Sequence, residues 1–379
     1  MRILFIHNRY QQRGGEDVAV ELESELLRDR GHQVQVLYFE NDHINPLRAV
    51  SNSKSYREVS EGITKFQPDV AHVHNLFFEA TPSILRALAV KGIPVVMTIH
   101  NYRLICANAL LLRDGRPCEL CVEQKFPTYG IRFRCYRNSM AASAMVVAIT
   151  GAHKIKGTWK NNVDKYIFLT DFSKSRFIGS SLEVGSEKMV VKPNFVKDIG
   201  GGGDRGDFFL FVGRLSEEKG IDVLVKAIKG FKLVVAGAGP NLTAENAEIT
   251  FTGQLKREQV MDLMKRAKAL IFPSIWYEGL PFTILEAFSV GTPVIASNLG
   301  SMAEMIQHGY NGFHFEAGNA GDLREKLNLF DQLSDQQRQE LSVNARNTYL
   351  TKYHPDVHYS SIISIYESVV HEKRQKRNE

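Results

Sequence analysis

Residues 272–287 read FPSIWYEGLPFTILEA, and this stretch decides the fold class. The apolar run that ends at its first residue predicts a strand, and Pro281 is typical of the first turn of a helix. We expect that helix to end at Gly291. Free backbone N–H groups from about Phe282 and Thr283 would then face the loop, where they favour an anion.

The same stretch carries two carboxylates, Glu278 in the predicted loop and Glu286 inside the predicted helix. A carboxylate accepts hydrogen bonds well from neighbouring hydroxyl groups, so a sugar or a ribose is a natural ligand. In the structural alternative, Glu278 complements the helix dipole and Glu286 is a surface acid. The residues alone leave both interpretations open.

Residues 210–221, LFVGRLSEEKGI, form a second strand–loop–helix pattern. The strand leads into Gly213 and Arg214, and Lys219 precedes the next helix. Arginine offers a planar fork of donors and lysine a point charge, so this pair of cations suits a diphosphate. A salt-bridged surface loop is the alternative that needs no ligand.

Apolar runs alternate with helical patterns along both halves of the chain, which indicates parallel sheets buried on both faces. Residues 197–207 contain four consecutive glycines and predict a linker. We therefore expect an α/β protein with two doubly wound domains, 1–196 and 197–355, and a terminal helix over 356–379 that packs toward the first domain. The expected strands are Arg2–His7, Gln33–Tyr38, Val70–His74, Pro94–Ile99, Tyr166–Leu169, Met189–Lys192, Phe208–Val212, Lys232–Ala236, Ala269–Phe272, Pro293–Ala296 and Gly312–Phe315.

The composition limits the class of protein. A chain of 379 residues with 44% hydrophobic and 23% charged residues can build more than one core, and it is not collagen-like, disordered or a multi-span membrane protein. No apolar run is long enough for an export signal or a membrane span, which predicts a cytoplasmic protein. The net charge is +5, and the stretch 101–176 is strongly basic. Its partner would be an anionic lipid, a phosphate-bearing substrate or nucleic acid, and nucleic acid is disfavoured because no recognition motif accompanies it.

All four cysteines lie within the segment 103–137. They are Cys106, Cys118, Cys121 and Cys135, in the pattern Cys-x11-Cys-x2-Cys-x13-Cys. In a reducing compartment such a cluster favours a structural zinc site over scattered core thiols. One or two disulfides and free thiols are the alternatives.

Four histidines fall at or near the carboxyl ends of predicted strands: His7, His72, His74 and His100. In parallel sheets these ends share one edge, so the side chains are expected to line one side of a ligand site. We favour hydrogen bonds to sugar hydroxyl groups over a metal site, and His100 is the strongest candidate.

Together these residues resemble family 4 glycosyltransferases of the GT-B fold, which are retaining enzymes that use nucleotide-sugar donors. The resemblance rests on Gly213-Arg214-Leu…Glu-Lys219-Gly followed by Glu278-x7-Glu286, and it covers nearly the whole chain. Further matches are Gly14-Gly15 after the first strand, Thr98-Ile-His100, Pro193-Asn194, and Gly253 after a short strand.

The resemblance implies a role for each matching residue. Arg214 and Lys219 would hold the donor diphosphate, and Glu286 the ribose. Glu278 and His100 would contact the donor sugar, His100 from the opposite domain. The other donor-binding positions that it implies are Gly14, Gly15, Gly213, Gly253, Leu255, Gly279, Leu280, Pro281, Phe282 and Thr283.

It also implies a front-face reaction in which the leaving phosphate accepts the proton of the incoming hydroxyl, with no catalytic metal or other cofactor. The donor would be UDP- or GDP-linked. The acceptor would be a glycan or a lipid-linked intermediate of surface polysaccharide, lipopolysaccharide or cell-envelope biosynthesis, reached at the inner face of a membrane through the basic stretch 101–176. The alternatives are a nucleotide-sugar epimerase and a GT-B scaffold or binding protein that has lost catalysis.

Overall fold

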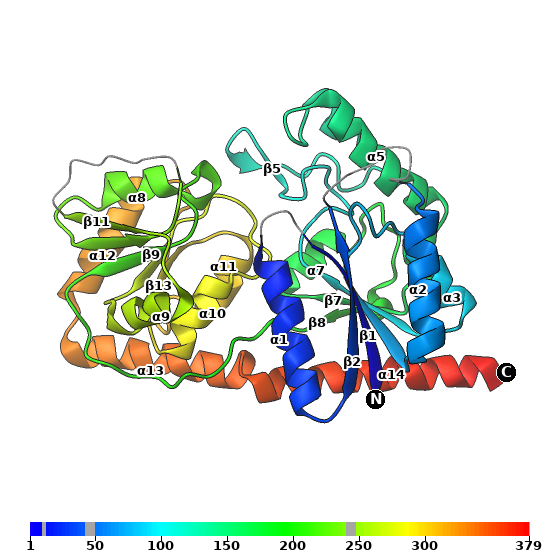
Figure 1. Ribbon diagram of the computed structural model, residues 1–379. Helices are drawn as coiled ribbons and strands as arrows, with labels where there is room; N and C mark the ends of the chain where they lie inside the picture. The colour runs from blue at the N-terminus through cyan, green and yellow to red at the C-terminus, as the bar shows by residue number, and fades with distance from the viewer. Residues whose placement is uncertain (10–12, 42–49, 240–247, 379) are drawn as a thin grey trace. The chain divides into compact units, whose positions relative to one another are not determined.

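The computed structural model describes residues 1–9, 13–41, 50–239 and 248–378 (Figure 1). The chain divides into two compact units. Unit 1 comprises Met1–Leu111, Cys118–Asn194 and His358–Glu379, and unit 2 comprises Leu112–Pro117 and Phe195–Val357. A six-stranded sheet forms the centre of each unit, and helices connect its strands.

The sheet of unit 1 is parallel throughout, in the order β2-β1-β3-β4-β7-β8. Its strand order reverses between β1 and β3, and ligands of such sheets bind beyond the carboxyl ends of the strands at that switch point. The strands are β1 (Arg2–Arg9), β2 (Gln33–Glu40), β3 (Val70–Asn75), β4 (Val95–Ile99), β7 (Lys165–Phe168) and β8 (Met189–Val191). The helices are α1 (Gly15–Asp29), α2 (Ser53–Phe66), α3 (Ile84–Val90), α4 (Thr128–Arg132), α5 (Met140–Ile155), α6 (Thr158–Asn162), α7 (Asp171–Phe177), η2 (Ser186–Lys188) and α14 (Pro355–Asn378).

The sheet of unit 2 is also parallel, in the order β11-β10-β9-β12-β13-β14, and its switch point lies between β9 and β12. The strands are β9 (Phe209–Val212), β10 (Leu233–Ala236), β11 (Ile249–Gly253), β12 (Leu270–Phe272), β13 (Val294–Ser297) and β14 (Gly312–Phe315). The helices are η3 (Glu217–Lys219), α8 (Ile221–Ala227), α9 (Arg257–Arg266), α10 (Phe282–Ser289), α11 (Gly300–Met305), α12 (Ala320–Gln332) and α13 (Asp335–Lys352). A hairpin of β5 (Leu112–Arg113) and β6 (Arg116–Pro117) completes the strands.

The last helix, α14, belongs to the core of unit 1. Its residues Ile362, Tyr366 and Val369 are fully or almost fully buried, in one apolar cluster with Phe5 of β1 and Val96 of β4. Burying large apolar side chains contributes roughly 1.5–3 kcal/mol each, so α14 adds substantially to the stability of a sheet formed by the first half of the chain.

The predicted fold class, parallel α/β with two doubly wound sheets, is confirmed. Two details differ from the expectations. Pro281 precedes α10 as its N-cap residue and does not lie in the first turn. The hairpin of β5 and β6 was not expected, because its strands are too short for a periodic pattern; its turn is Asp114-Gly115, with φ values of +51° and +70°.

Candidate active site

The candidate residues of unit 2 lie on two loops that leave adjacent strands at the switch point. β9 pairs with β12 through Leu210 and Leu270. Gly213, Arg214 and Lys219 follow β9, and Glu278 lies in the loop that follows β12. Because the two loops leave neighbouring strands at the same edge, residues far apart in sequence come together here.

Lys219 and Glu278 form an ion pair at 2.7 Å between Nζ and Oε1. Ser274 donates a second hydrogen bond to the same carboxylate oxygen at 2.8 Å. Glu278 is buried, and Lys219 Nζ lies 5.5 Å from the centroid of the Phe272 ring. The pair thus fixes one cation and one anion together, 59 residues apart in sequence, at the end of the sheet.

Arg214 is held more loosely. Its guanidinium donates to Glu218 Oε1 at 3.1 Å, and its side chain is 69% exposed. Ser216 donates to the same oxygen of Glu218 at 2.7 Å. The salt-bridged surface loop considered for this stretch is therefore present, but an exposed pair of this kind contributes at most about 1 kcal/mol and gives way easily to a ligand.

Gly220 fixes the approach of these two loops. Its φ is +70°, and a Cβ atom there would lie 1.9 Å from the carbonyl oxygen of Pro273. The Ile275 N–H donates to the Glu218 carbonyl oxygen at 3.0 Å across the same contact. A side chain at position 220 would therefore push apart the loops that bring Lys219 to Glu278.

Glu286 projects from α10 beside a cavity of about 430 Å³. Arg257 Nη2 lies 3.3 Å from its Oε1, and the Glu286 side chain is only 17% exposed. Burial raises the pKa of Glu286, and the charge of Arg257 opposes that rise. Arg257 was not singled out from the sequence, although its place at the start of α9, four residues after Gly253, was a usable signal. The lining includes Glu286, Ser289, Arg257, Met261, Lys197 and Ile199.

The remaining predicted donor-binding positions lie around these loops. Gly253 is exposed at the end of β11 with a φ of +70°, and Leu255 follows it before α9. Leu280 and Pro281 are buried, so only their backbone is available to a ligand. Phe282 and Thr283 form the first turn of α10 and are partly exposed, as is Gly279.

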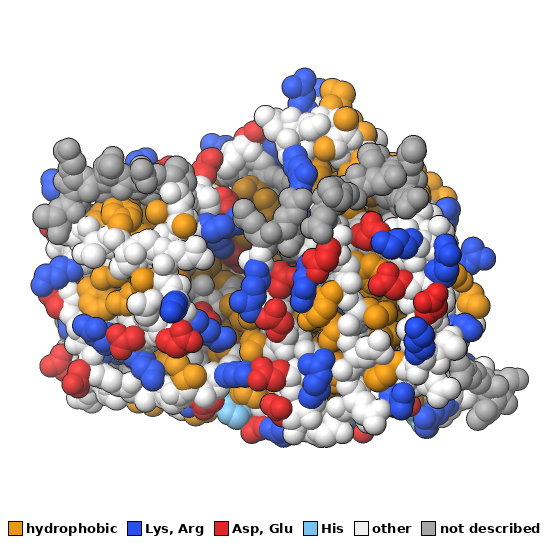
Figure 2. All heavy atoms as spheres, viewed as in Figure 1, with side chains coloured by type: hydrophobic (Ala, Val, Ile, Leu, Met, Phe, Trp, Pro, Cys, Tyr) orange, Lys and Arg blue, Asp and Glu red, His pale blue; other side chains and the backbone are white. Residues whose placement is uncertain are grey.

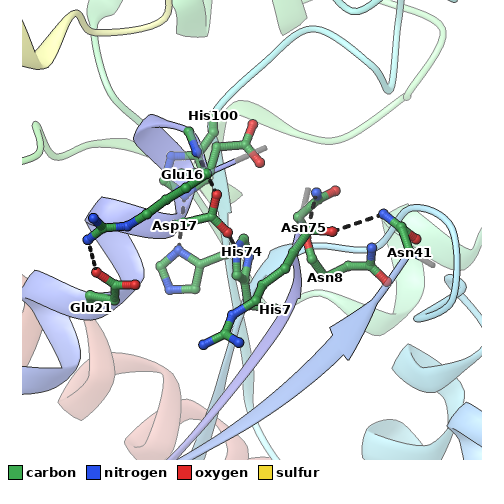
Figure 3. Close-up of polar contacts among 12 residues, drawn as sticks. His7, Asn8, Glu16, Asp17, Glu21, Asn41, His74, Asn75 and His100 are labelled. Atoms are coloured by element: carbon green, nitrogen blue, oxygen red, sulfur yellow. Dashed lines mark hydrogen bonds and ion pairs between the residues drawn. The ribbon is translucent and has the colours of Figure 1, made fainter. Parts of the chain in front are cut away.

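In unit 1, His100 directly follows β4 and stacks on His74 near the end of β3 (Figure 3). His74 Nδ1 lies 3.0 Å from His100 Nε2. Burial is the largest cause that lowers the pKa of both rings, so both are neutral at neutral pH. A neutral imidazole has one N–H donor and one acceptor nitrogen, which suits a hydrogen bond to a hydroxyl group.

The loop after β1 leads into α1 through Gly14 and Gly15. The Gly14 N–H donates to Asp17 Oδ2 at 2.8 Å, and His7 Nε2 lies 2.9 Å from the other oxygen of that carboxylate (Figure 3). Burial acts to raise the pKa of Asp17, but the hydrogen bonds from His7 and Gly14 lower it overall. Gly14 has an ordinary φ of −123°, and a Cβ atom there would meet nothing within 3.8 Å. Neither the backbone conformation nor the space around position 14 therefore requires a glycine there.

His72 is not at the edge where it was expected. It lies in the interior of β3, fully buried, with Nδ1 2.9 Å from Glu23 Oε1 and Nε2 2.7 Å from Thr98 Oγ1. Lys192 and His358 also contact Glu23, at 3.0 and 2.7 Å. The carboxylate of Glu23 thus contacts residues far apart in sequence, Tyr366 at 3.5 Å among them, and His72 belongs to this core network.

Among the described residues, the group whose potential ligand atoms all lie within 4.8 Å of one another consists of Glu23, His72 and His74. The ammonium of Lys192 already neutralises Glu23 in this buried place, so the arrangement is a polar core network and does not suit a second cation. All four cysteines lie within the described part of unit 1, where none of them forms a disulfide, and zinc at these cysteines stays a prediction.

The basic stretch 101–176 begins after β4 and includes the helices α4, α5 and α6. Exposed apolar side chains are interspersed with its cations, including Phe133, whose ring lies 5.6 Å below the guanidinium of Arg132. Figure 2 shows hydrophobic and basic atoms together near the top of the view, where Figure 1 places α5. None of the described helices has the length and apolar character that crossing a bilayer requires.

Comparison with known proteins identifies the class. HepE from Anabaena, in complex with UDP, superposes with a TM-score of 0.65 at 16% identity, covering 97% of this chain and 100% of that one. The fold is therefore that of the GT-B glycosyltransferases. An uncharacterized glycosyltransferase of Methanocaldococcus jannaschii is 25% identical over 86% of this chain and 87% of its own length. A Bacillus subtilis glycosyltransferase assigned to teichuronic acid biosynthesis is 25% identical over 81% and 83%.

A family model matches part of unit 2. Residues 197–348 match the model of the family described as Glycosyl transferases group 1. The chain thus has the GT-B fold, and the resemblance to glycosyltransferases that was inferred from the sequence is confirmed by the group 1 match over residues 197–348 and by its glycosyltransferase relatives. Membership of family 4 in particular stays a prediction.

Proposed function

We propose that the chain transfers a sugar from a UDP- or GDP-linked donor to a glycan or lipid-linked acceptor of surface polysaccharide, lipopolysaccharide or cell-envelope biosynthesis. The observation that carries this proposal is the ion pair of Lys219 and Glu278 at the switch point of unit 2. Complexes of HepE with UDP and UDP-glucose support a nucleotide-sugar donor. The relative assigned to teichuronic acid biosynthesis supports an envelope acceptor.

Arg214 and Lys219 hold the donor diphosphate in this proposal. Both cations follow β9, and both now contact carboxylates that a diphosphate can displace: Glu218 at 3.1 Å and Glu278 at 2.7 Å. Charge-assisted hydrogen bonds to phosphate are among the strongest in proteins, so the exchange favours a doubly charged ligand. The N–H groups at the start of α10 add to the same positive potential.

Glu286 and Glu278 act as hydroxyl acceptors. Glu286 lines the cavity beside α10, and its carboxylate accepts from the ribose once Arg257 moves aside. Glu278 contacts the donor sugar through its carboxylate oxygens, and the hydrogen bond from Ser274 at 2.8 Å keeps the carboxylate oriented. The backbone at Gly253 and the side chain of Leu255 border the base.

The chemistry we infer is retention by front-face attack. The bond between the anomeric carbon and the phosphate oxygen breaks, the acceptor hydroxyl attacks from the same face, and the leaving phosphate takes its proton. Negative charge grows on the diphosphate in the transition state, and cations that are already held in position to stabilise this charge lower the barrier. Arg214 and Lys219 supply that charge without a metal, and the neutral imidazole of His100 suits a hydrogen bond to a hydroxyl group.

We assign the basic stretch 101–176 to recognition of the acceptor. Its cations and exposed apolar side chains suit an anionic membrane surface, where amphipathic groups insert and lysine or arginine meets head groups. Flotation with vesicles containing anionic lipid should recover more protein than flotation with neutral vesicles. Equal recovery from both would remove the membrane contact and leave the transferase assignment standing.

A thermal-shift panel tests the donor site. UDP, GDP, ADP, CDP and TDP are compared with their common sugar conjugates on the full chain. A ligand at a hundredfold its dissociation constant adds about 2.7 kcal/mol to the free energy of unfolding. One nucleotide should therefore raise the melting temperature more than the others do.

No shift with any nucleotide would favour the scaffold that has lost catalysis. The metal-free chemistry is tested separately: sugar transfer should continue when EDTA is added during the assay. An immediate loss that magnesium reverses would contradict it.

A further inference from the structure

Unit 1 contains a cavity of about 600 Å³ that is separate from the candidate active site. Every described residue that lines it belongs to unit 1, and the lining comes from α2, from α3 and from the corner between α5 and α6. The helices α2 and α3 pack side by side (Figure 1), and α6 packs against α3. The volume is within the range of roughly 300–1,000 Å³ that is typical of small-molecule sites.

His153 joins two walls of this cavity. Its ring is buried, and its Nε2 lies 2.7 Å from the Val50 carbonyl oxygen, which can only accept, so Nε2 carries the proton. Its Nδ1 is then an acceptor, and the Thr158 hydroxyl donates to it at 3.0 Å. Burial lowers the pKa of His153, in agreement with a neutral ring. The segment before α2 is thus fixed to the corner between α5 and α6, and the cavity is formed before a ligand binds.

Two cations line the cavity, and among the described residues no acidic side chain does so. The cations are Arg86 of α3 and Lys156, which directly follows α5. Both are exposed, and neither side chain forms an ion pair or a hydrogen bond with another described residue. The cavity beside Glu286 differs, because Glu258 and Asp262 also line it. The cavity of unit 1 therefore has a positive potential without a counter-charge among these side chains, and it attracts an anion.

Uncharged polar groups accompany the two cations. The hydroxyls of Ser51 and Tyr56 and the side-chain amide of Asn162 line the same cavity and have no hydrogen-bond partner among the described residues. Each of these groups can donate to a phosphate oxygen or form a hydrogen bond with an alcohol group. Exposed cations are often simply solvated, but a solvated surface does not require unpartnered donors from α2, α3 and α6 to converge on one hollow. The arrangement therefore favours a ligand that carries both an anion and hydroxyl groups.

We propose that this cavity binds a phosphate ester of a small polyol, of the glycerol phosphate class. Arg86 and Lys156 contact the phosphate, the arginine through paired donors and the lysine as a point charge. The hydroxyl and amide groups of the lining contact the polyol. Glycerol phosphate exists both as a free ion and as the head group of a phospholipid, so the same chemistry can come from either source. The proposal depends neither on the transfer reaction nor on the donor site of unit 2.

Phosphorus NMR titration of the full chain with glycerol 3-phosphate tests the proposal. A variant with Arg86→Gln and Lys156→Gln should bind at least about tenfold more weakly than the wild type, because it loses the charged donors to the phosphate. The matched control carries Arg57→Gln and Lys160→Gln, which change exposed cations of α2 and α6 outside the described lining, and it should bind as the wild type does. No binding by the wild type, or equal affinities of the wild type and the first variant, would overturn the proposal.

Lys219→Ala separates this cavity from the proposed diphosphate site. Lys219 belongs to unit 2 and the described lining of the cavity to unit 1, so this variant should bind glycerol 3-phosphate as the wild type does. If Lys219→Ala loses the binding and the variant of Arg86 and Lys156 keeps it, the phosphate binds in unit 2 and the proposal for this cavity is wrong. If Lys219→Ala loses only sugar transfer, the proposal stands.

Vesicles identify the source of the phosphate ester. Flotation compares vesicles of phosphatidylcholine with vesicles that also contain phosphatidylglycerol, whose head group is a glycerol phosphate. If the ligand is this head group, the variant of Arg86 and Lys156 should be recovered less than the control variant, and free glycerol 3-phosphate should compete with the vesicles. If the ligand is a free ester, both variants should be recovered equally while only the first loses binding in solution. An equal fall in recovery of both variants would be an effect of total charge and would overturn the lipid source.

Discussion

The two switch points of this chain differ in their electrostatics. In unit 2, Arg214 and Lys219 are cations at the ends of the sheet, held by carboxylates that a ligand can replace. In unit 1, His74 and His100 are neutral rings. Glu23, a charged group of the core beneath them, is buried and contacts His72, Lys192 and His358. The contrast suggests that unit 2 recognises an anion and that unit 1 recognises hydroxyl groups.

The largest expected effect is on stability. It tests whether Glu23 is a structural charge in the core of unit 1, in contrast to the charges of the proposed ligand site in unit 2. Changing Glu23→Gln leaves the ammonium of Lys192 buried without its counter-charge, and breaking such a pair costs about 3–5 kcal/mol. Urea unfolding should show a large fall in the midpoint. The exposed Glu25→Gln on the same helix should stay within about 0.5 kcal/mol, and equal midpoints of the two variants would show that Glu23 is not a structural charge.

The second effect is on turnover in unit 2. Lys219→Ala removes a fixed positive charge that faces the developing phosphate charge, and a loss of about 10²–10³-fold in kcat is expected. Lys226→Ala, an exposed lysine of the following helix, is the matched control and should turn over normally. Circular dichroism checks that both variants are folded. Near-normal turnover of Lys219→Ala would exclude it from the diphosphate site.

A smaller effect is expected on nucleotide binding. Glu286→Gln should weaken the binding of the free nucleotide by about tenfold, because hydrogen bonds to a charged acceptor contribute roughly 1.5–3 kcal/mol. Glu258→Gln changes an exposed acid that lines the same cavity and should bind as the wild type does. Calorimetric titration measures both, and unchanged affinity in Glu286→Gln would count against a ribose contact.

The smallest effect expected from a single residue is the contribution of each buried histidine to the pH dependence of stability. Burial lowers the folded-state pKa of His74, His100 and His358, the last to about 4, below the ordinary value near 6.5. The unfolded chain therefore binds more protons, so stability is full above about pH 6.5 and falls as the pH decreases. Each histidine contributes at most about 1.4 kcal/mol per pH unit.

Glu23 extends this loss to more acidic pH. Its folded-state pKa is lowered well below 4.5: burial acts to raise it, but Lys192 and His72 prevail. Its contribution is present above about pH 4.5 and is lost as the pH falls through its folded-state pKa. Melting curves from pH 8 to pH 4 should show the decline beginning near pH 6.5, and a constant melting temperature down to pH 5 would contradict the buried neutral histidines.

The sheets were predictable because buried parallel strands read as continuous apolar runs, as in Phe209–Val212 and Val294–Ser297. The edge strand Ile249–Gly253 was expected only as a short strand before Gly253, without bounds, because it alternates apolar and polar residues and has a sheet neighbour on one side only. Such apolar runs do not specify the order of the strands in the sheet. The contact of Lys219 with Glu278 depends on that order, so the sequence identified both residues but did not predict that they contact each other.

The network around Glu23 could not be predicted from the sequence, for a different reason. An acidic residue in an amphipathic helix normally faces solvent, and its partners Lys192 and His358 lie 169 and 335 residues away. His72 was placed with the site histidines because it lies two residues before the expected strand end at His74, but the structure places it inside β3. Such long-range charge pairs are determined by packing, which a local pattern does not encode.

The most direct test of the central claim compares a nucleoside diphosphate with its nucleoside on the wild type and on Lys219→Ala. The claim is that the cations of unit 2 recognise the diphosphate. The nucleotide is the one selected by the thermal-shift panel, and calorimetry gives all four affinities. We predict that the variant binds the diphosphate about 10–100-fold more weakly and the nucleoside equally well. An equal loss for both ligands, or no loss for either, would contradict the account.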